Sequence, residues 1–373
     1  MFAKARYSRC ALGRTSSATG TIAEKFATGG GMKLAIGTGT GGNRQPDVAF
    51  IQRAEALGYD SVWSGETWGT DAFSPLAYLA AVTDKIKLGT SIAHVDARTP
   101  AATAMTAQTI DALAGGGRVL LGIGTSGPQV VEGWHGRLWG RPNYRLRDNV
   151  AIMRKVWSGE HVEHHGKEIQ LPYQGADKIG LGKPLRNAMK EVPPIPILIG
   201  AETDLNIKMT GEIADGLITL HSVPRQLEQI RALLAEGAAR RSDGVTVDDL
   251  AIVGGVGVTV TDDVQGAIDA AKRGIALYAG GFGAASMNFH KDAFAKRGYQ
   301  AEADRIQELF LAGRRDEAAA AVPDEYVDEE LLIGPLERIR ERFATWRDSA
   351  FTTVRINTNR EDVLAMLAEQ VAA

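Results

Sequence analysis

The sequence predicts a (β/α)8 barrel, and three of its features support this fold class. Apolar runs too short for helices alternate with amphipathic segments from Met32 to the C-terminus, as in parallel β/α units. These runs number eight. Several of them end in Gly-rich loops, which indicates that parallel strands converge on one face. A doubly wound sheet needs fewer units and a single crevice, so we prefer the barrel for this chain of 373 residues.

The predicted strands are short, and their Val, Ile and Leu content suits burial on both faces. In chain order they span residues 33–37, 61–64, 86–91, 119–123, 196–201, 216–221, 252–261 and 352–357. Barrel enzymes build their sites from the loops at the C-terminal ends of the strands. This rule places at the mouth residues 38–42, 65–68, 91–94, 125–127 and 200–202, together with His221 and the region of Asn357.

The predicted helices carry recognisable start and stop signals. Asp47 is an N-cap candidate and Gly58 a stop, and Pro75 and Pro100 stand in first turns, where a missing N–H costs nothing. Further helices are expected over residues 144–157, 204–212, 225–239, 264–278 and 335–347. Between them lie an irregular excursion, residues 158–192, and an insertion between the seventh and eighth strands, residues 279–334, with helical composition.

We expect the site to be organised around residues 119–136, VLLGIGTSGPQVVEGWHG. A buried strand here runs into Gly124, Thr125, Ser126 and Gly127, which offer small side chains, free backbone N–H groups and two hydroxyls. Such a turn suits a phosphate or a flat ring pressed against the backbone. The ligand is therefore expected at this strand end.

The same glycines also satisfy the dinucleotide fingerprint G-x-G-x-x-G, and residues 37–42 satisfy it a second time. In the Rossmann fold the third glycine runs into a helix. Here Pro128 follows one copy directly and Asn-Arg-Gln-Pro follows the other, so we expect neither copy to lead at once into a helix. On this ground the Rossmann interpretation is set aside.

The composition is that of an ordinary enzyme and excludes several function classes. The chain is 44% hydrophobic and 23% charged with a net charge of −3, so no nucleic-acid partner is implied. No stretch approaches the roughly 18 uninterrupted apolar residues of a membrane span. The motifs HExxH, G-x-x-x-x-G-K-[ST] and G-x-S-x-G are all missing, so zinc protease, NTPase and serine hydrolase chemistry lack their residues.

Residues 1–31 differ from the rest of the chain. They are basic, rich in Ser, Thr, Ala and Gly, and without apolar periodicity. A leader peptide or a misassigned start upstream of Met32 explains this composition, and we divide the chain into this extension and one barrel domain, residues 32–373. The only cysteine, Cys10, lies in the extension, so the body forms no internal disulfide and a cytoplasmic location is expected.

Several pieces of the chain, in order and spacing, resemble the luciferase-like flavin monooxygenase superfamily, specifically its branch that uses the deazaflavin coenzyme F420. They are ALGYDSVWSGE (56–66), KLGTSI (87–92), ALAGGGRVLLGIGTSG (112–127), RPNYRLRDNVAIMRKVW followed by HGKEIQL (141–171), and PILIGAET (196–203). The resemblance covers nearly all of residues 32–373. The segment SGPQVVEGWHG and residues 288–299 resemble an actinobacterial-type subgroup of that branch.

The resemblance implies a TIM barrel that holds the deazaflavin at its mouth. It also implies a non-proline cis peptide after the third strand, at Ser91–Ile92, that supports the back of the ring. The implied cofactor contacts are Glu66, Ser91, Ile92, Thr125, Ser126, Gly127, Gly200, Ala201 and Glu202. Sugar-phosphate dehydrogenases of this branch carry a catalytic His where this chain has Thr67, so the resemblance does not extend to their reaction.

Candidate catalytic residues follow from position at the mouth. Glu66 at the end of the second strand is a general-acid candidate or a hydrogen-bonding acid, and His94, just after the implied cis bond, is a proton donor or a structural histidine. Trp68 and Trp134 form substrate walls or core lids. A histidine cluster, His161, His164 and His165, fits no common zinc spacing and lies in the excursion, so no metal is expected.

The predicted function is hydride transfer between C5 of F420 and a small organic substrate. An FMN-dependent monooxygenase that works with a separate flavin reductase is the alternative within the same fold, and a non-catalytic flavin-binding protein is a further one. The expected partners are a small-molecule substrate and a second copy in a homodimer, with no membrane and no nucleic acid.

Overall fold

Eight parallel strands close into a barrel, as the sequence predicts. The computed structural model describes residues 31–39, 45–189, 193–282 and 288–372. The barrel strands are β1 (Lys33–Gly37), β2 (Ser61–Ser64), β3 (Lys87–Thr90), β5 (Val119–Gly124), β8 (Ile197–Gly200), β9 (Gly216–Ile218), β10 (Ala251–Val260) and β12 (Thr353–Asn357). Each pairs with the next, and β12 pairs with β1 to close the ring. Cys10, Gly42 and the N-terminal extension up to residue 30 lie outside the described residues.

The interior of the barrel is filled by side chains from alternate positions of the strands. This interior cluster consists of Ala35, Trp63, Leu120, Leu198, Ile218, Ala251 and Val253, with Ile92 packed against it. Trp63 is the largest of them, and a Cβ at Gly89 on the next strand would lie 2.4 Å from its ring. Gly89 is therefore needed for Trp63 to fill the barrel. The barrel interior is therefore a packed core.

The helices predicted around the barrel are confirmed with small shifts at their ends. They are α2 (Val48–Ala56), α3 (Ser74–Ala80), α4 (Pro100–Leu113), α6 (Pro142–Ser158), α7 (Asp204–Ile213), α8 (Leu227–Ala238), α9 (Val264–Gly281) and α14 (Leu336–Arg347). The Asp47 side chain caps α2 by accepting a hydrogen bond from the Phe50 N–H at 3.1 Å. A final helix, α15 (Glu361–Ala372), was not predicted.

One argument from the sequence is wrong, although its conclusion holds. A short helix, α5 (Pro128–Gly133), begins directly after Gly127, so this glycine motif does run into a helix. Pro128 starts the helix rather than preventing it, because a proline fits the first turn, where no N–H is needed. The Rossmann fold is excluded by the closed barrel itself.

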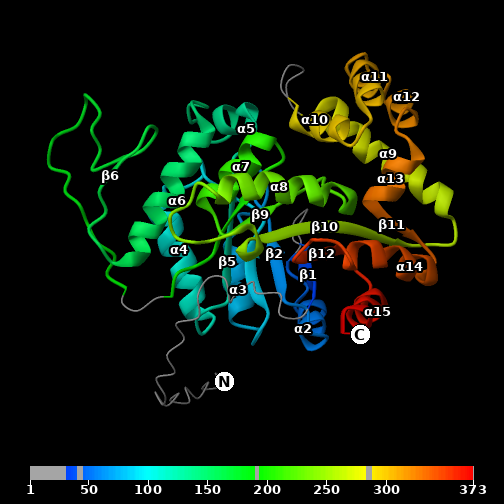
Figure 1. The fold of residues 1–373 in the computed structure, drawn as a ribbon, viewed down its shortest axis with the longest axis horizontal. Helices are drawn as coiled ribbons and strands as arrows, with labels where there is room; N and C mark the ends of the chain where they lie inside the picture. The colour runs from blue at the N-terminus through cyan, green and yellow to red at the C-terminus, as the bar shows by residue number, and fades with distance from the viewer. Residues whose placement is uncertain (1–30, 40–44, 190–192, 283–287, 373) are drawn as a thin grey trace, which may run out of the picture.

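Other short elements were also missed. Strand β4 (Ala93–His94) extends the sheet beyond β3 by pairing with β5, and β6 (His164–His165) with β7 (Gln170–Leu171) form a small hairpin in the excursion. Figure 1 shows this excursion on the left of the molecule, on the opposite side from α10 and α11.

The insertion forms a helical lobe with its own core. Its elements are α10 (Phe289–Lys296), α11 (Gln300–Leu311), α12 (Arg315–Ala320), α13 (Asp324–Glu330) and β11 (Leu331–Gly334). Ile268 and Ala276 of α9 share a hydrophobic cluster with Phe294, Ile306 and Leu309, so α9 belongs structurally to this lobe. We use "the lobe" for residues 264–334, without the undescribed residues 283–287.

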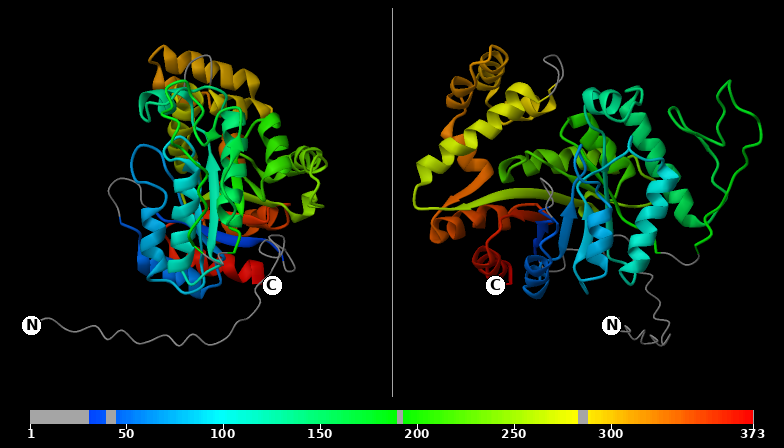
Figure 2. Two further views of the ribbon diagram at one scale, coloured as in Figure 1. Left: turned by 90° about the vertical axis from the view of Figure 1, so that its left-hand side faces the viewer. Right: turned by 180° about the vertical axis from the view of Figure 1, so that it is seen from behind.

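The lobe lies at the mouth end of the barrel. Figures 1 and 2 show α10 and α11 on the same side as α5, which follows the C-terminal end of β5. Strand β11 pairs in parallel with the outer end of the long strand β10, which continues past the barrel. Among the described residues, no helix is both long and apolar enough to cross a membrane.

Candidate active site

The cis peptide implied by the family resemblance is present at Ser91–Ile92, between β3 and β4. We use "the bulge" for Ser91 and Ile92, the two residues that this peptide joins. Three of the glycines at strand ends make room for it. A Cβ at Gly124 would lie 3.1 Å from Ile92 Cγ1, and one at Gly200 would lie 3.0 Å from Ile92 Cγ2. A Cβ at Gly65 would lie 3.1 Å from the Ser91 carbonyl oxygen. The Gly-rich strand ends therefore seat the bulge.

An inward-facing arginine supports the bulge from inside the barrel. Arg355 of β12 donates from Nη1 to the Ser91 Oγ at 2.7 Å. No carboxylate lies within ion-pair distance of Arg355 among the described residues, and burial lowers the pKa of its guanidinium. The alternation of Thr-Val-Arg-Ile-Asn along β12 puts Arg355 on the inward face, a signal that the sequence analysis did not use.

His94 is a buried neutral hydrogen-bond donor at the mouth. Its side chain is 2% exposed, and its Nδ1 accepts a hydrogen bond from the Asp96 N–H at 3.1 Å. Burial lowers the pKa of His94, which the Asp96 carboxylate only partly offsets. The neutral ring therefore carries its proton on Nε2. This atom is buried and has no partner among the described residues.

Two neighbours were not predicted as parts of the His94 environment. The His135 ring lies 4.7 Å from the His94 ring, and its Nε2 is likewise buried without a partner in the described part of the chain. Arg145 donates to Asp96 Oδ1 at 2.5 Å and so fixes the loop that holds the His94 ring. The Arg145–Asp96 contact joins the loop after β4 to α6. The two residues are 49 positions apart in the chain, so a local sequence pattern does not predict their contact.

The Glu66 carboxylate is occupied by protein groups. It accepts from the His94 backbone N–H at 2.9 Å and from Arg98 Nη1 at 2.7 and 3.0 Å. A weaker contact from the Ala72 N–H at 3.4 Å completes the set. Arg98 is thereby paired with Glu66. Glu66 ties β2 to the His94 strand.

The other predicted cofactor contacts lie on two loops of the mouth. Thr125, Ser126 and Gly127 join β5 to α5 and are partly exposed. Trp134 ends α5 and is 64% exposed. Glu202, after β8, accepts from the backbone N–H groups of Leu220 and His221, and burial raises its pKa.

Trp68 makes contact with the lobe. Its ring stacks on Phe282, at the end of α9, with the ring centres 5.6 Å apart. Phe282 lies 5.2 Å from the ring of His290, and His290 Nδ1 lies 2.7 Å from His221 Nε2. The sequence placed His221 at the mouth, but nothing in the sequence pairs it with His290. This row of rings links the barrel to the lobe.

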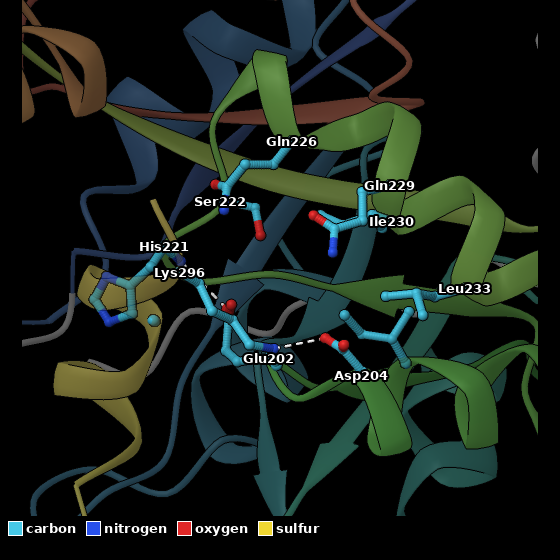
Figure 3. Close-up of a pocket in the computed structure, with 11 residues that line it drawn as sticks. Glu202, Asp204, His221, Ser222, Gln226, Gln229, Ile230, Leu233 and Lys296 are labelled. Atoms are coloured by element: carbon cyan, nitrogen blue, oxygen red, sulfur yellow. Dashed lines mark hydrogen bonds and ion pairs between the residues drawn. The ribbon is translucent and has the colours of Figure 1, made fainter. Parts of the chain in front are cut away.

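A cavity of about 220 Å³ lies beside His221, between α7, α8 and α10. Figure 3 shows its polar lining, with Asp204 and Lys296 in an ion pair of 2.7 Å at one edge. The His221 ring lies at the other edge, over α10. No group of three metal-ligating side chains occurs in the described ranges, and His164 instead contacts Asp148 at 3.0 Å.

A closed (β/α)8 barrel with buried polar side chains at its mouth is the architecture of a TIM-barrel enzyme. The sequence profile of the luciferase-like monooxygenase family matches residues 31–353. The chain belongs to this family and is an oxidoreductase, as its resemblances predicted.

Individual relatives agree with this assignment. The chain is 38% identical to a Mycobacterium tuberculosis protein named as a candidate coenzyme F420-dependent oxidoreductase, over 91% of this chain and 99% of that protein. It is 28% identical to a 5,10-methylenetetrahydromethanopterin reductase of Archaeoglobus fulgidus, over 82% and 87%. The solved F420-dependent tetrahydromethanopterin reductase of Methanopyrus kandleri matches with a TM-score of 0.68 over 92% and 98%, and its 20% identity supports the fold alone.

Proposed function

We propose that this protein is an F420-dependent oxidoreductase that passes a hydride between C5 of the deazaflavin and an electrophilic carbon of a small organic substrate. The observation that carries the proposal is the Ile92 side chain, seated on Gly124 and Gly200 beside the buried His94. The similarity to a relative whose name includes F420 supports the choice of cofactor.

The mouth fits a flat ring with polar edges. Gly65, Gly124 and Gly200 bring backbone without a side chain close to the bulge. Ser64 Oγ, His94 Nε2 and Thr219 Oγ1 are buried at or near strand ends and have no partner in the described residues. Buried polar atoms are rarely left unpaired, so a ring with carbonyl and N–H edges is a suitable partner for them.

The deazaflavin, when bound, supplies the hydride. With the cofactor bound, Ile92 would support the ring, and His94 would donate a hydrogen bond from its Nε2–H to the ring or to the substrate. Arg355, beside Ser91, offers a positive charge that stabilises negative charge on the ring. Trp68 forms part of the substrate wall, where its exposed ring meets the lobe.

In this proposal Glu66 is a positioning residue. Its oxygens already accept from Arg98 and from the His94 N–H, so it holds β4 in place. His94, as a neutral donor, stabilises charge better than it supplies a proton. The catalytic assignment of both residues stays a proposal, and loss of turnover in His94→Ala but retention in Glu66→Gln is the expected pattern.

The test is equilibrium binding of F420 and of FMN, measured side by side on the full chain by fluorescence titration. Tight binding of F420 alone is expected, followed by oxidation of reduced F420 in a screen of small electrophiles. Preference for FMN would overturn the proposal in favour of a monooxygenase that works with a separate reductase. Tight binding of F420 without turnover of any acceptor would support the non-catalytic binding protein. The homodimer and the cytoplasmic location stay predictions.

A further inference from the structure

A row of side-chain rings crosses the mouth of the barrel. In the closed sheet β2 and β9 are separated by four strand steps in either direction, so they stand on opposite sides. Trp68 follows β2 and His221 follows β9, and the lobe residues Phe282 and His290 connect them through the ring contacts given above. The lobe therefore roofs the space above the Ser91–Ile92 bulge.

His290 is held firmly in this roof. The Asn288 side chain caps α10 by accepting from the His290 N–H at 3.0 Å and the Lys291 N–H at 3.2 Å. Its amide nitrogen donates to the carbonyl oxygens of Tyr278 and Ala279, both at 3.0 Å. One buried side chain thus fixes the start of α10 to the end of α9, and with it the His290 ring.

The protonation of the two histidines follows from their neighbours. Burial alone would lower the pKa of His221, but the Glu330 carboxylate, 3.6 Å from its Nδ1, raises it above the ordinary value. Burial lowers the pKa of His290 to about 3, and the charge on His221 acts in the same direction. The Glu330 carboxylate thus favours the imidazolium form of His221, and in that form its Nε2–H donates to His290 Nδ1, 2.7 Å away.

This arrangement puts the single proton of the neutral His290 on its Nε2. That atom is buried, in a residue 5% exposed, and has no partner among the described residues. The rings of Tyr278, Phe282 and Phe289 lie within 5.2 Å of the His290 ring. A neutral N–H among aromatic rings suits a neutral acceptor, because an anion would be poorly solvated there.

We propose that His290 and His221 form a proton relay that serves the oxygen of a small carbonyl substrate. His290 donates its Nε2 proton to that oxygen and takes the Nε2 proton of His221 on its Nδ1, so His221 becomes neutral and His290 stays neutral. The carbonyl carbon gains the hydride of the proposed function, its π electrons move to oxygen, and the product is an alcohol. The substrate class, though not the relay's protonation pattern, rests on that proposed function.

A carboxylate and a cavity beside His221 complete the relay. Glu330 is a positioning residue that holds the charge on His221 and is itself paired with Arg297 Nη1 at 2.6 Å. His221 also borders the cavity of Figure 3, whose polar lining includes Ser222 and Gln226. A cavity of about 220 Å³ has room for several water molecules, which gives His221 a route to recover its proton from solvent.

The first experiment reads the protonation pattern directly by ¹⁵N NMR of the imidazole nitrogens in the full chain, without cofactor. We expect His221 to be charged at pH 7 and His290 to be neutral with its proton on Nε2. In Glu330→Gln, His221 should become neutral at the same pH while the fold is retained. A neutral His221 in the wild type, or a His290 proton on Nδ1, would overturn the relay.

The second experiment tests the substrate oxygen with acetophenone and with α-methylstyrene, which has a carbon in place of the carbonyl oxygen. We expect the wild type to bind acetophenone about tenfold more tightly, the worth of one hydrogen bond, and to shift the His290 Nε2 resonance. His290→Phe should abolish the preference, and His165→Gln, at an exposed histidine of the excursion, should keep it.

Equal binding of the two probes by the wild type, or no acetophenone binding at millimolar concentration, would overturn the carbonyl assignment. These wild-type measurements decide the point even if His290→Phe does not fold. Failure of F420 to bind would instead count against the proposed function, and it leaves both experiments unaffected.

Discussion

The ion pair between Glu66 and Arg98 offers a quantitative test of the positioning role given to Glu66. The Glu66 side chain is 6% exposed and that of Arg98 26% exposed, with a shortest contact of 2.7 Å. Arg98→Met removes the positive charge but keeps most of the aliphatic stem. It leaves the Glu66 carboxylate buried, with only the His94 N–H at 2.9 Å and the distant Ala72 N–H as donors.

The expected cost follows from the burial of this pair. Two unit charges about 4 Å apart interact by about 4 kcal/mol at an effective dielectric constant near 20. Partial exposure of Arg98 reduces this value, so we expect Arg98→Met to lower the free energy of unfolding by about 2 to 3 kcal/mol. In Glu66→Gln the buried charge is gone, and adding Arg98→Met should then cost about 1 kcal/mol or less.

Urea unfolding of the two single variants and the double variant measures the coupling energy, which we expect to be about 2 kcal/mol. Arg141→Met is the matched control, because Arg141 is 57% exposed in its ion pair with Glu168 and should cost below about 1 kcal/mol. If the stability losses of the two single variants add up to that of the double variant within about 0.5 kcal/mol, the reasoning is refuted, because the two side chains would then act independently.

The remaining predictions concern the bulge and the lobe. Gly200→Ala should push Ile92 out of place and weaken F420 binding several-fold in a fluorescence titration. Gly274→Ala is the control, because a Cβ there meets open space, and it should leave the affinity unchanged. Equal F420 affinities of the two variants would contradict the role given to Gly200 in seating Ile92. Asn288→Ala should lower the free energy of unfolding by about 2 to 4 kcal/mol, because four hydrogen bonds of a buried cap are lost; a loss like that of a surface cap would contradict this. His290 has a folded pKa of about 3, below its ordinary value of 6.5, so its contribution to stability is present above pH 6.5 and is lost as the pH falls toward 3. His290→Phe should therefore lose less stability than the wild type between pH 6.5 and pH 4 in thermal melts, and parallel melting curves would contradict the shift.

The regular part of the fold could be predicted because its signals are local. The Asp47 cap, the prolines of first turns and the apolar runs each fix an element from a few neighbouring residues. Strand β11 is different: Leu331–Gly334 is an ordinary apolar run, and only its partner, the outer end of β10, makes it a strand. A local pattern does not identify a partner more than 70 residues away.

The candidate site likewise contains residues that local signals identify and residues whose role depends on a distant partner. His94 and Glu66 were found because both follow predicted strands, and the structure brings them together through the His94 N–H. His290 was missed because its meaning depends on His221, 69 residues earlier, across the space between barrel and lobe. Arg355 was within reach of the alternation rule, but a charged side chain inside a barrel goes against the usual expectation of an apolar interior.

The two ends of the lobe meet at one point of the sheet. The Thr261 N–H donates to the Gly334 carbonyl oxygen at 3.1 Å, just where β10 ends and β11 ends beside it. The segment between these two strand ends can therefore be exchanged between relatives, because both joins lie next to each other on the paired strands β10 and β11. Such chimaeras would carry a new lobe over an unchanged barrel.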